Sequence, residues 1–268
     1  MAYQSTLDHP GRDTNDFYRR TLHVLSDARV PFLVGGSHAL LNYTGIVRDT
    51  KDFDLFVKQD DLEAALEALR QAGYHTEITF PHWLAKATHG GDIVDLVFSS
   101  GNGICRVDDE WFQYALEADV LGMPVKIAPV EELLWQKSFV MERERYDGAD
   151  VAHILRSCAE SLDWDRVIRR FDPYWQLLLS YLVLFTFIYP SDRQRIPGRV
   201  LTSLVGRLTH DLDAPPSNDR VCRGTLMSRA QYLLDIGRYG YADARLLPHG
   251  NMSPEDAVYW TWAIDNVD

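Results

Sequence analysis

The sequence predicts an α+β protein in which a mixed β-sheet flanked by helices is followed by an all-α C-terminal part. Short apolar runs typical of strands recur between helical stretches up to Pro129, and the periodicity is helical beyond it. The composition, 46% hydrophobic and 12% aromatic, is sufficient for a folded core. We therefore expect two domains, residues 1–129 and residues 130–268.

The elements of the first part follow from period-2 or period-3.6 patterns bounded by glycine and proline. A helix over residues 60–73 is expected to close at Gly73, and the helix after Gly36 to end at Gly45. The other expected helices are residues 14–29 and 110–119, and the expected strands are residues 32–34, 50–58, 75–80, 83–88, 92–100 and 123–127.

The second part shows helical periodicity over most of its length. Its most apolar stretch, residues 174–189, is about four residues short of a membrane span, so we interpret it as a buried helix. The other helical stretches are residues 130–146, 147–160, 197–210 and 221–237 and the segment after Ser253, with a surface loop over residues 213–219.

The charge balance restricts the class of partner. The chain has 27 basic and 39 acidic residues, a net charge of −12, which argues against a protein that coats nucleic acid. Residues 1–160 carry 15 basic and 26 acidic side chains, a net charge of −11. Residues 161–240, by contrast, carry 11 arginines and 8 aspartates, a net charge of +3.

The cysteines and the amino terminus indicate the compartment. The three cysteines lie far apart and show no C-x-x-C spacing, which excludes a disulfide framework and a cysteine zinc site. The first 20 residues are polar and lack the apolar core of a signal peptide. We therefore expect a cytoplasmic protein that does not associate with membranes.

Two motifs near the amino terminus suggest phosphate and metal chemistry. Gly35-Gly36-Ser37 follows a short strand and opens a helix, where exposed N–H groups favour an anion and Ser37 could cap the helix. Asp52 and Asp54 alternate with core residues along a strand, so both carboxylates point to one face. A tight turn and a solvated edge strand are the simpler interpretations of the two motifs.

A third carboxylate extends this pattern. Asp95 lies in the middle of the apolar strand that begins at Asp92, where a lone carboxylate needs a partner. If this strand lies beside the first, Asp95 joins Asp52 and Asp54 in a cluster that suits Mg²⁺ with substrate phosphates.

The order of these motifs resembles the nucleotidyltransferase superfamily related to DNA polymerase β, especially its minimal, toxin–antitoxin and antibiotic-modifying branches. The similarity covers roughly residues 30–160 and includes Arg48 and Thr50 before the Asp pair. It implies that Gly35, Gly36 and Ser37 hold the triphosphate. Asp52 and Asp54 would bind Mg²⁺ (or Mn²⁺), and Asp95 would ligate a second ion and help deprotonate an acceptor hydroxyl.

The resemblance implies transfer of a nucleoside monophosphate from an NTP such as ATP to an acceptor, with release of pyrophosphate. The acceptor could be an aminoglycoside-like small molecule, tRNA or a protein, and a cognate antitoxin is a possible partner. Arg48 and Lys137 are candidate phosphate ligands, although Arg48 with Lys51 could balance charge and Lys137 could be an ordinary helix lysine. For His38, Asp147 and Asp150 we favour a helix residue and helix caps.

Other functions remain open at this point. A non-catalytic nucleotide-binding or toxin–antitoxin interaction protein could retain the fold, although it would be expected to lose some of the motif residues. A glycosyltransferase with a D-x-D motif would need a longer domain before Asp52. The arginines of the second part could receive RNA or form a solvated helix face: Arg166, Arg169, Arg170, Arg193, Arg195, Arg199, Arg207, Arg220, Arg223 and Arg229.

Overall fold

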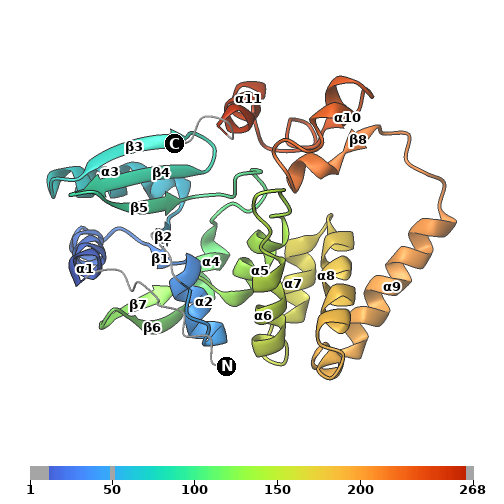
Figure 1. Cartoon of the computed structure of the whole chain (residues 1–268), viewed down its shortest axis with the longest axis horizontal. Helices are drawn as coiled ribbons and strands as arrows, with labels where there is room; N and C mark the ends of the chain where they lie inside the picture. Colours follow the sequence, from blue (N-terminus) through green and yellow to red (C-terminus); the bar gives the residue numbers. More distant parts are fainter. Residues whose placement is uncertain (1–11, 49–51, 264–268) are drawn as a thin grey trace, which may run out of the picture. The chain divides into compact units, whose positions relative to one another are not determined.

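The structure is a computed structural model that describes residues 12–48 and 52–263. The chain divides into two units. The first, here called the sheet unit, consists of Met1–Ser99 and Arg106–Pro129. The second, the helical unit, consists of Val130–Asp268 together with the short segment Ser100–Cys105. Figure 1 shows both units coloured along the chain.

The sheet unit is built around a seven-stranded sheet with the strand order β3-β4-β5-β2-β1-β7-β6 (Figure 1). Its strands are β1 (Leu33–Val34), β2 (Phe53–Phe56), β3 (His75–Phe80), β4 (Leu84–His89), β5 (Asp92–Val97), β6 (Leu116–Val120) and β7 (Met123–Ile127). Its helices are α1 (Arg12–Asp27), α2 (Gly36–Thr44), α3 (Leu62–Gln71), which follows the 3-10 turn η1 (Gln59–Asp61), and α4 (Asp109–Gln113). The sheet is mixed, because β2 is parallel to β5 and antiparallel to β1.

Hydrophobic periodicity accounts for the core of this unit. Phe53 and Leu55 of β2 and Leu96 of β5 are fully buried, as the alternation in their strands predicts. α3 buries one stripe, Leu62, Ala65, Leu66 and Leu69. Gly45 caps α2 in the left-handed conformation. The expected α+β class with a helix-flanked mixed sheet is confirmed.

The helix predicted over residues 110–119 is wrong in its second half. α4 ends at Gln113, and β6 then forms an antiparallel hairpin with β7, in which Val120 pairs with Met123. The two turn residues, Leu121 and Gly122, both have positive φ, 57° and 79°, as a tight hairpin turn requires. The leucine, alanine and glutamate of this stretch favour a helix locally, but pairing at the sheet edge outweighs that preference.

The helical unit contains a series of helices, of which the last three are separated by longer segments (Figure 1). They are α5 (Val130–Ser138), α6 (Gly148–Cys158), α7 (Trp164–Phe171), α8 (Trp175–Ile188), α9 (Gly198–Asp213), α10 (Leu233–Gly237) and α11 (Pro254–Trp262), with the 3-10 turns η2 (Arg193–Arg195) and η3 (Arg223–Leu226). A two-stranded parallel pair, β8 (Val221–Cys222) and β9 (Ala242–Asp243), adds to them.

Two stretches of this unit are less helical than predicted. The stretch 130–146 is helical only to Ser138, and Met141 and Tyr146 then form an antiparallel bridge. The stretch 221–237 forms β8, η3 and the short α10. Gly224 is buried within this stretch, and a Cβ there would lie 2.3 Å from the Tyr232 ring, so close packing holds the chain in a non-helical path.

The apolar stretch 174–189 is confirmed as a helix, α8. Leu178, Leu182 and Phe185 are buried in it, whereas Phe187 is 82% exposed. None of the helices within residues 12–48 and 52–263 is long and apolar enough to cross a membrane.

The segment Ser100–Cys105 lies between β5 and α4 in sequence but packs in the helical unit. The buried Asn102 amide donates to the Leu226 carbonyl at 2.8 Å, and its oxygen accepts from the Ile104 N–H at 3.1 Å. Asn251 donates to the Gly103 carbonyl at 3.1 Å. These hydrogen bonds satisfy the polar groups of a segment that is otherwise enclosed.

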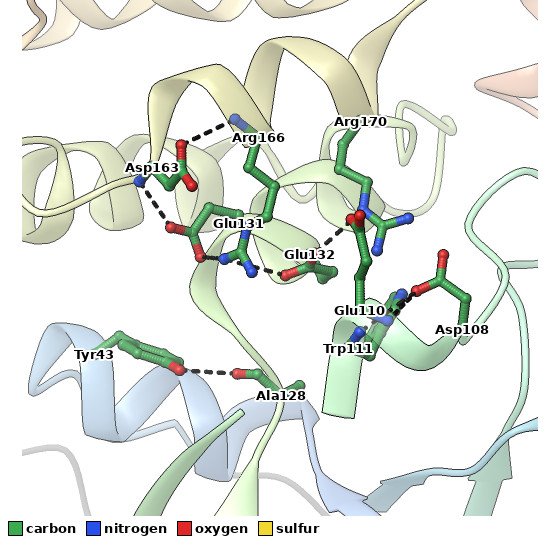
Figure 2. Close-up of polar contacts among 10 residues, drawn as sticks. All are labelled: Tyr43, Asp108, Glu110, Trp111, Ala128, Glu131, Glu132, Asp163, Arg166 and Arg170. Carbon is green, nitrogen blue, oxygen red and sulfur yellow. Dashed lines mark hydrogen bonds and ion pairs between the residues drawn. The ribbon is translucent and has the colours of Figure 1, made fainter. Parts of the chain in front are cut away.

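Buried charges connect α5 with α7 (Figure 2). Arg166 forms ion pairs with Glu131 and Glu132, and Arg170 Nε lies 3.2 Å from Glu132 Oε1. Glu132 is fully buried. Burial raises the pKa of Glu132 to about 7, with Glu131 acting in the same direction and Arg166 and Arg170 opposing it.

We expect the stability of the protein relative to a Glu132→Gln variant to fall as the pH rises. A carboxyl whose folded-state pKa is raised, here from 4.5 to about 7, contributes stability that is present below pH 4.5 and lost as the pH rises through 7. The loss should approach about 3 kcal/mol between pH 4.5 and 8. Urea unfolding of both proteins across this range measures it, and a difference independent of pH would contradict it.

Candidate active site

The centre of the sheet places two of the candidate carboxylates side by side. β2 and β5 are parallel neighbours whose register pairs Asp54 with Asp95. Adjacent strands lie about 4.8 Å apart, so the two residues are direct neighbours across the ladder. Asp52 directly precedes β2 and is exposed, whereas Asp54 and Asp95 are half-buried. All three carboxylates therefore belong to one region of the sheet unit.

The Gly35-Gly36 turn packs directly on this region. The Gly35 N–H donates to the Asp54 carbonyl at 2.9 Å. Gly36 has a φ of +53°, and a Cβ on it would lie 1.8 Å from Asp54 Oδ2. A Cβ on Gly35 would lie 2.1 Å from the Phe56 ring. Glycine is therefore required at both positions by close approach, and at Gly36 also by backbone conformation.

The turn opens α2, so the amino-terminal end of that helix lies next to the Asp54 carboxylate. α2 begins at Gly36 with Gly35 at the N-cap position, and Ser37 lies inside the first turn. The expectation that Ser37 caps the helix is thus wrong, because the N-cap position is Gly35, two residues earlier. The first N–H groups of a helix have no acceptor within it and attract anions.

Asp95 has a basic neighbour that the sequence did not single out. Lys86 of β4 is its register partner, and Lys86 Nζ lies 3.4 Å from Asp95 Oδ1. Among the described residues, this buried oxygen accepts no hydrogen bond. Burial raises the pKa of Asp95, the Lys86 ammonium opposes this shift, and the Asp52 carboxylate reinforces it. Asp95 is thus a partly buried carboxylate whose Oδ1 faces the Lys86 ammonium.

Tyr18 of α1 packs beneath the carboxylates. Its ring is buried and stacks on Phe53 at 4.4 Å between centroids. Burial and then the charges of Asp92, Asp52, Asp54 and Asp95 raise the pKa of the Tyr18 phenol to about 12. The phenol therefore stays protonated near neutral pH, where it can donate a hydrogen bond but not remove a proton.

His38 and Asp92 complete the surroundings of Tyr18. His38 packs edge-on against Phe53, with 5.1 Å between centroids, and burial lowers the pKa of its imidazole, which suits a neutral helix residue. Asp92 begins β5 and accepts a hydrogen bond from the Thr14 hydroxyl at 3.0 Å. These contacts give both residues structural partners.

The carboxylates of Asp52, Asp54 and Asp95 partly fit the requirements of a divalent cation site. Three carboxylates are the ligand chemistry that Mg²⁺ prefers, although Oδ1 of Asp95 is ion-paired with Lys86. The close approach of Gly36 to Asp54 also leaves that carboxylate beside an anion-attracting helix end. In the described part of the chain, however, no three His, Cys, Asp or Glu side chains converge closely enough to hold a metal ion. The carboxylates would have to move together to bind one.

The remaining candidates lie apart from this cluster in sequence. Arg48 is exposed after α2, whereas Thr50 and Lys51 lie outside the described residues. Lys137 belongs to α5 of the helical unit, where its Nζ lies 2.7 Å from Asp150 Oδ2 and 3.2 Å from Asp147 Oδ2.

Asp147 has two basic partners. Burial acts to raise the pKa of its carboxyl, but Lys137 and Arg145 outweigh that effect and lower it. Asp147 occupies the N-cap position of α6, but its carboxylate makes no capping hydrogen bond and binds these two basic side chains instead, so the expected capping role is wrong. Asp150 lies in the first turn of α6 rather than at its cap.

Residues 14–176 match the protein family described as nucleotidyl transferase of unknown function (DUF2204). The match covers more than half of the chain. The chain belongs to this family. It is therefore a nucleotidyltransferase, an enzyme that transfers a nucleoside monophosphate, and the resemblance seen in its motifs is confirmed. The matched range includes β1–β7 and ends at the start of α8.

Solved structures of other nucleotidyltransferases resemble this one at low sequence identity. The antibiotic-resistance factor ANT(2'')-Ia is 16% identical, with 63% of this chain and 94% of that chain covered and a TM-score of 0.46. The lincomycin-bound lincosamide adenylyltransferase LnuA is 15% identical, with 55% and 98% covered and a TM-score of 0.39. An antigenic nucleotidyltransferase-like protein from Paracoccidioides brasiliensis is 17% identical, with 69% and 92% covered and a TM-score of 0.41. None of the curated proteins matches the sequence significantly.

Two neighbours of the carboxylates in this nucleotidyltransferase were missed by the sequence analysis. Lys86 lies in an alternating strand and could have been found only by knowing that β4 pairs with β5 in this register. Tyr18 follows Phe17 in α1 and is buried like it. The pair Phe17-Tyr18 was a usable signal, because two adjacent buried aromatics widen the apolar face of a helix.

We expect Gly36→Ala to disrupt the nucleotidyltransferase more than Gly45→Ala, its matched control at the other end of α2. Both glycines have a left-handed φ, +53° and +69°, so both variants acquire backbone strain of about 1 kcal/mol. Only at Gly36 would the new methyl group collide with Asp54, whereas nothing lies within 4 Å at Gly45. Chemical denaturation should show an additional loss of about 2 kcal/mol for Gly36→Ala. Equal losses would contradict the close approach.

Proposed function

We propose that this nucleotidyltransferase transfers a nucleoside monophosphate from an NTP to an acceptor hydroxyl in a reaction that depends on Mg²⁺ or Mn²⁺ and releases pyrophosphate. The observation that carries the proposal is the register pair Asp54–Asp95, with Gly36 packed against the Asp54 carboxylate. It combines hard anionic ligands with an anion-attracting helix end, and phosphoryl transfer needs both. We assign the catalytic domain to residues 1–129 and a helical C-terminal domain to residues 130–268.

Gly35, Gly36 and Ser37 would bind the triphosphate. The absence of a Cβ at Gly36 lets a phosphate approach the first turn of α2, where Ser37 adds a hydroxyl donor. Arg48 and Lys137 are further candidate phosphate ligands. A phosphate would have to compete with Asp147 and Asp150 for Lys137.

Asp52, Asp54 and Asp95 would hold the cation. When bound, it supplies charge neutralisation on the nucleotide phosphates. Asp54 and Asp95 approach it from adjacent strands, and Asp52 from the chain just before β2. Lys86 meanwhile offsets the repulsion among the carboxylates in the free protein.

Asp95 is suited to accept the proton of the acceptor hydroxyl, because burial and Asp52 raise the pKa of its carboxyl. In the transfer, the acceptor oxygen forms a bond to the α-phosphorus. The bond from that phosphorus to the bridging oxygen breaks, and pyrophosphate leaves with the electron pair. The protein contributes mainly by positioning the two reactants.

The acceptor that the charges favour is a cationic small molecule of the aminoglycoside type. Residues 1–129 carry 11 basic and 19 acidic side chains, a net charge of −8, which attracts cations toward the sheet unit and disfavours a polyanion. A labelled-NTP transfer screen against aminoglycosides, total RNA and cell protein separates this acceptor from tRNA and protein acceptors. AMP transfer to a protein or tRNA in that screen would favour a toxin with a cognate antitoxin.

The second candidate function is a nucleotide-binding or toxin–antitoxin interaction protein without transferase activity. The observation in its favour is that the carboxylates do not converge as metal ligands within the described residues. Calorimetric titration with ATP and Mg²⁺ together with the transfer screen separates the two candidates. Metal-dependent NTP binding without any labelled acceptor would favour the second.

We expect Asp54→Asn to lower transfer of labelled nucleoside monophosphate at least about 100-fold, because the amide removes a charged ligand at the centre of the site. Asp60→Asn, on the exposed turn η1, is the matched control and should retain full activity. Circular dichroism and thermal unfolding verify that both variants fold. Wild-type transfer by Asp54→Asn would refute the assignment of Asp54.

We expect Lys86→Met to strengthen binding of Mn²⁺ in the absence of nucleotide. The Lys86 ammonium lies 3.4 Å from Asp95 Oδ1, where its positive charge repels a metal cation. Its removal should therefore increase the affinity of Asp95 for metal. Lys126→Met, on the exposed side of β7, makes the same change in net charge away from Asp95 and is the control. Calorimetry at pH 8 compares the three proteins. Weaker binding by Lys86→Met than by Lys126→Met would show that Lys86 supports the site rather than competes for it.

A further inference from the structure

Most arginines of the helical unit are neutralised by a nearby carboxylate. Arg199 pairs with Asp165 at 2.8 Å and Arg207 with Asp172 at 2.7 Å, although Arg199 is exposed and Arg207 is half-buried. Such pairs explain much of the arginine content without any partner molecule. The other pairs are Arg145–Asp147, Arg195–Glu160, Arg229–Glu142, Arg245–Asp243 and the α5–α7 cluster of Figure 2.

Three arginines near β8 and α10 differ. Arg220, Arg223 and Arg238 are exposed, and no carboxylate of the described chain lies within ion-pair distance of them. Each guanidinium lies over a tyrosine ring instead. The distances to the ring centroids are 4.7 Å for Arg220 on Tyr241, 5.5 Å for Arg223 on Tyr174 and 5.9 Å for Arg238 on Tyr239. Their charge is therefore available to a ligand.

The backbone gathers most of these residues in one place. The pairing of β8 with β9 brings Arg220 beside Ala242, whose N–H donates to the Arg220 carbonyl at 2.7 Å. The Arg220 guanidinium donates to the Tyr239 carbonyl at 2.6 Å. Tyr239 and Tyr241 are 51% and 39% exposed. We call this set the Arg–Tyr surface: Arg220, Arg223, Arg238, Tyr239 and Tyr241.

We propose that the Arg–Tyr surface binds single-stranded RNA. Unpaired guanidinium groups bind phosphate oxygens, and exposed aromatic rings provide stacking partners for unpaired bases. Stacking on tyrosine holds the guanidinium groups in place before binding, which lowers the entropy cost of the contact. Tyrosine hydroxyls supply partners for the 2′-hydroxyl groups that distinguish RNA from DNA.

The charge of these guanidinium groups supports this ligand although the whole chain is acidic. The net charge of +3 over residues 161–240 includes four arginines that pair with carboxylates outside this range. The three guanidinium groups without a carboxylate partner therefore carry the electrostatic argument. An anionic membrane is a poorer match, because α10, with five residues, is too short to lie in a bilayer interface. The proposed binding requires neither NTP nor metal, so it goes beyond the proposed transfer reaction and does not depend on it.

Fluorescence anisotropy of a labelled 20-nucleotide single-stranded RNA, with full-length protein and EDTA, tests the proposal. The variant R220A/R223A/R238A should bind at least tenfold more weakly, and the slope of log K against log salt should become shallower by about 2. The variant Y239A/Y241A should bind at least fivefold more weakly with the slope unchanged, because it removes stacking and keeps the charge.

The matched control is R195A/R199A/R207A, which removes three ion-paired arginines of the same unit and should change binding less than twofold. Circular dichroism verifies that all variants fold. The variant R220K/R238K keeps the positive charge but loses the planar guanidinium stacking, so it should weaken RNA binding two- to tenfold.

Four outcomes would overturn the proposal. They are no RNA binding at 50 mM salt, an equal loss in the ion-paired control, equal binding of single-stranded DNA, and equal competition by polyglutamate or by phosphatidylserine vesicles. Since all arms omit NTP and metal, a failure here is distinguishable from a failure of the transfer reaction.

Discussion

The backbone of Gly36 lies against the Asp54 carboxylate, and the arrangement of the whole site depends on this contact. The strand β2 can carry Asp54 at the centre of the sheet only because residue 36 has no side chain, since a Cβ would lie 1.8 Å from its oxygen. The same contact places the start of α2 beside the carboxylate, where the helix end stabilises negative charge. The parallel register then sets Asp95 next to Asp54, and Lys86 offsets the added charge.

The sequence predicts those features that depend on local patterns. The strands around Asp54 and Asp95, the turn at Gly35 and the cap at Gly45 follow from alternation and glycine placement. Features that depend on long-range pairing could not be predicted. Lys86 faces Asp95 through a register that no local pattern encodes, and β6 forms from a helix-prone segment because β7 pairs with it.

The net charge describes this protein less well than the burial and pairing of its individual charged groups. Glu132 is ionisable yet fully buried, and the arginines around it are occupied in holding α5 to α7. Arg199 is exposed and Arg207 half-buried, and because both are paired with a carboxylate, they contribute little field at a distance. The net charge of a segment therefore does not show which of its charged groups lack a partner.

The segment Ser100–Cys105 restricts how genetic recombination can exchange the helical unit between related proteins. The chain leaves the sheet unit after Ser99, returns at Arg106 and leaves again after Pro129. An exchange of genetic material at codon 129 would transfer nearly all of the helical unit but leave behind Asn102, whose amide donates to the Leu226 carbonyl. The two parts are thus expected to diversify together, because one recombination event cannot move the helical unit with all of its own contacts.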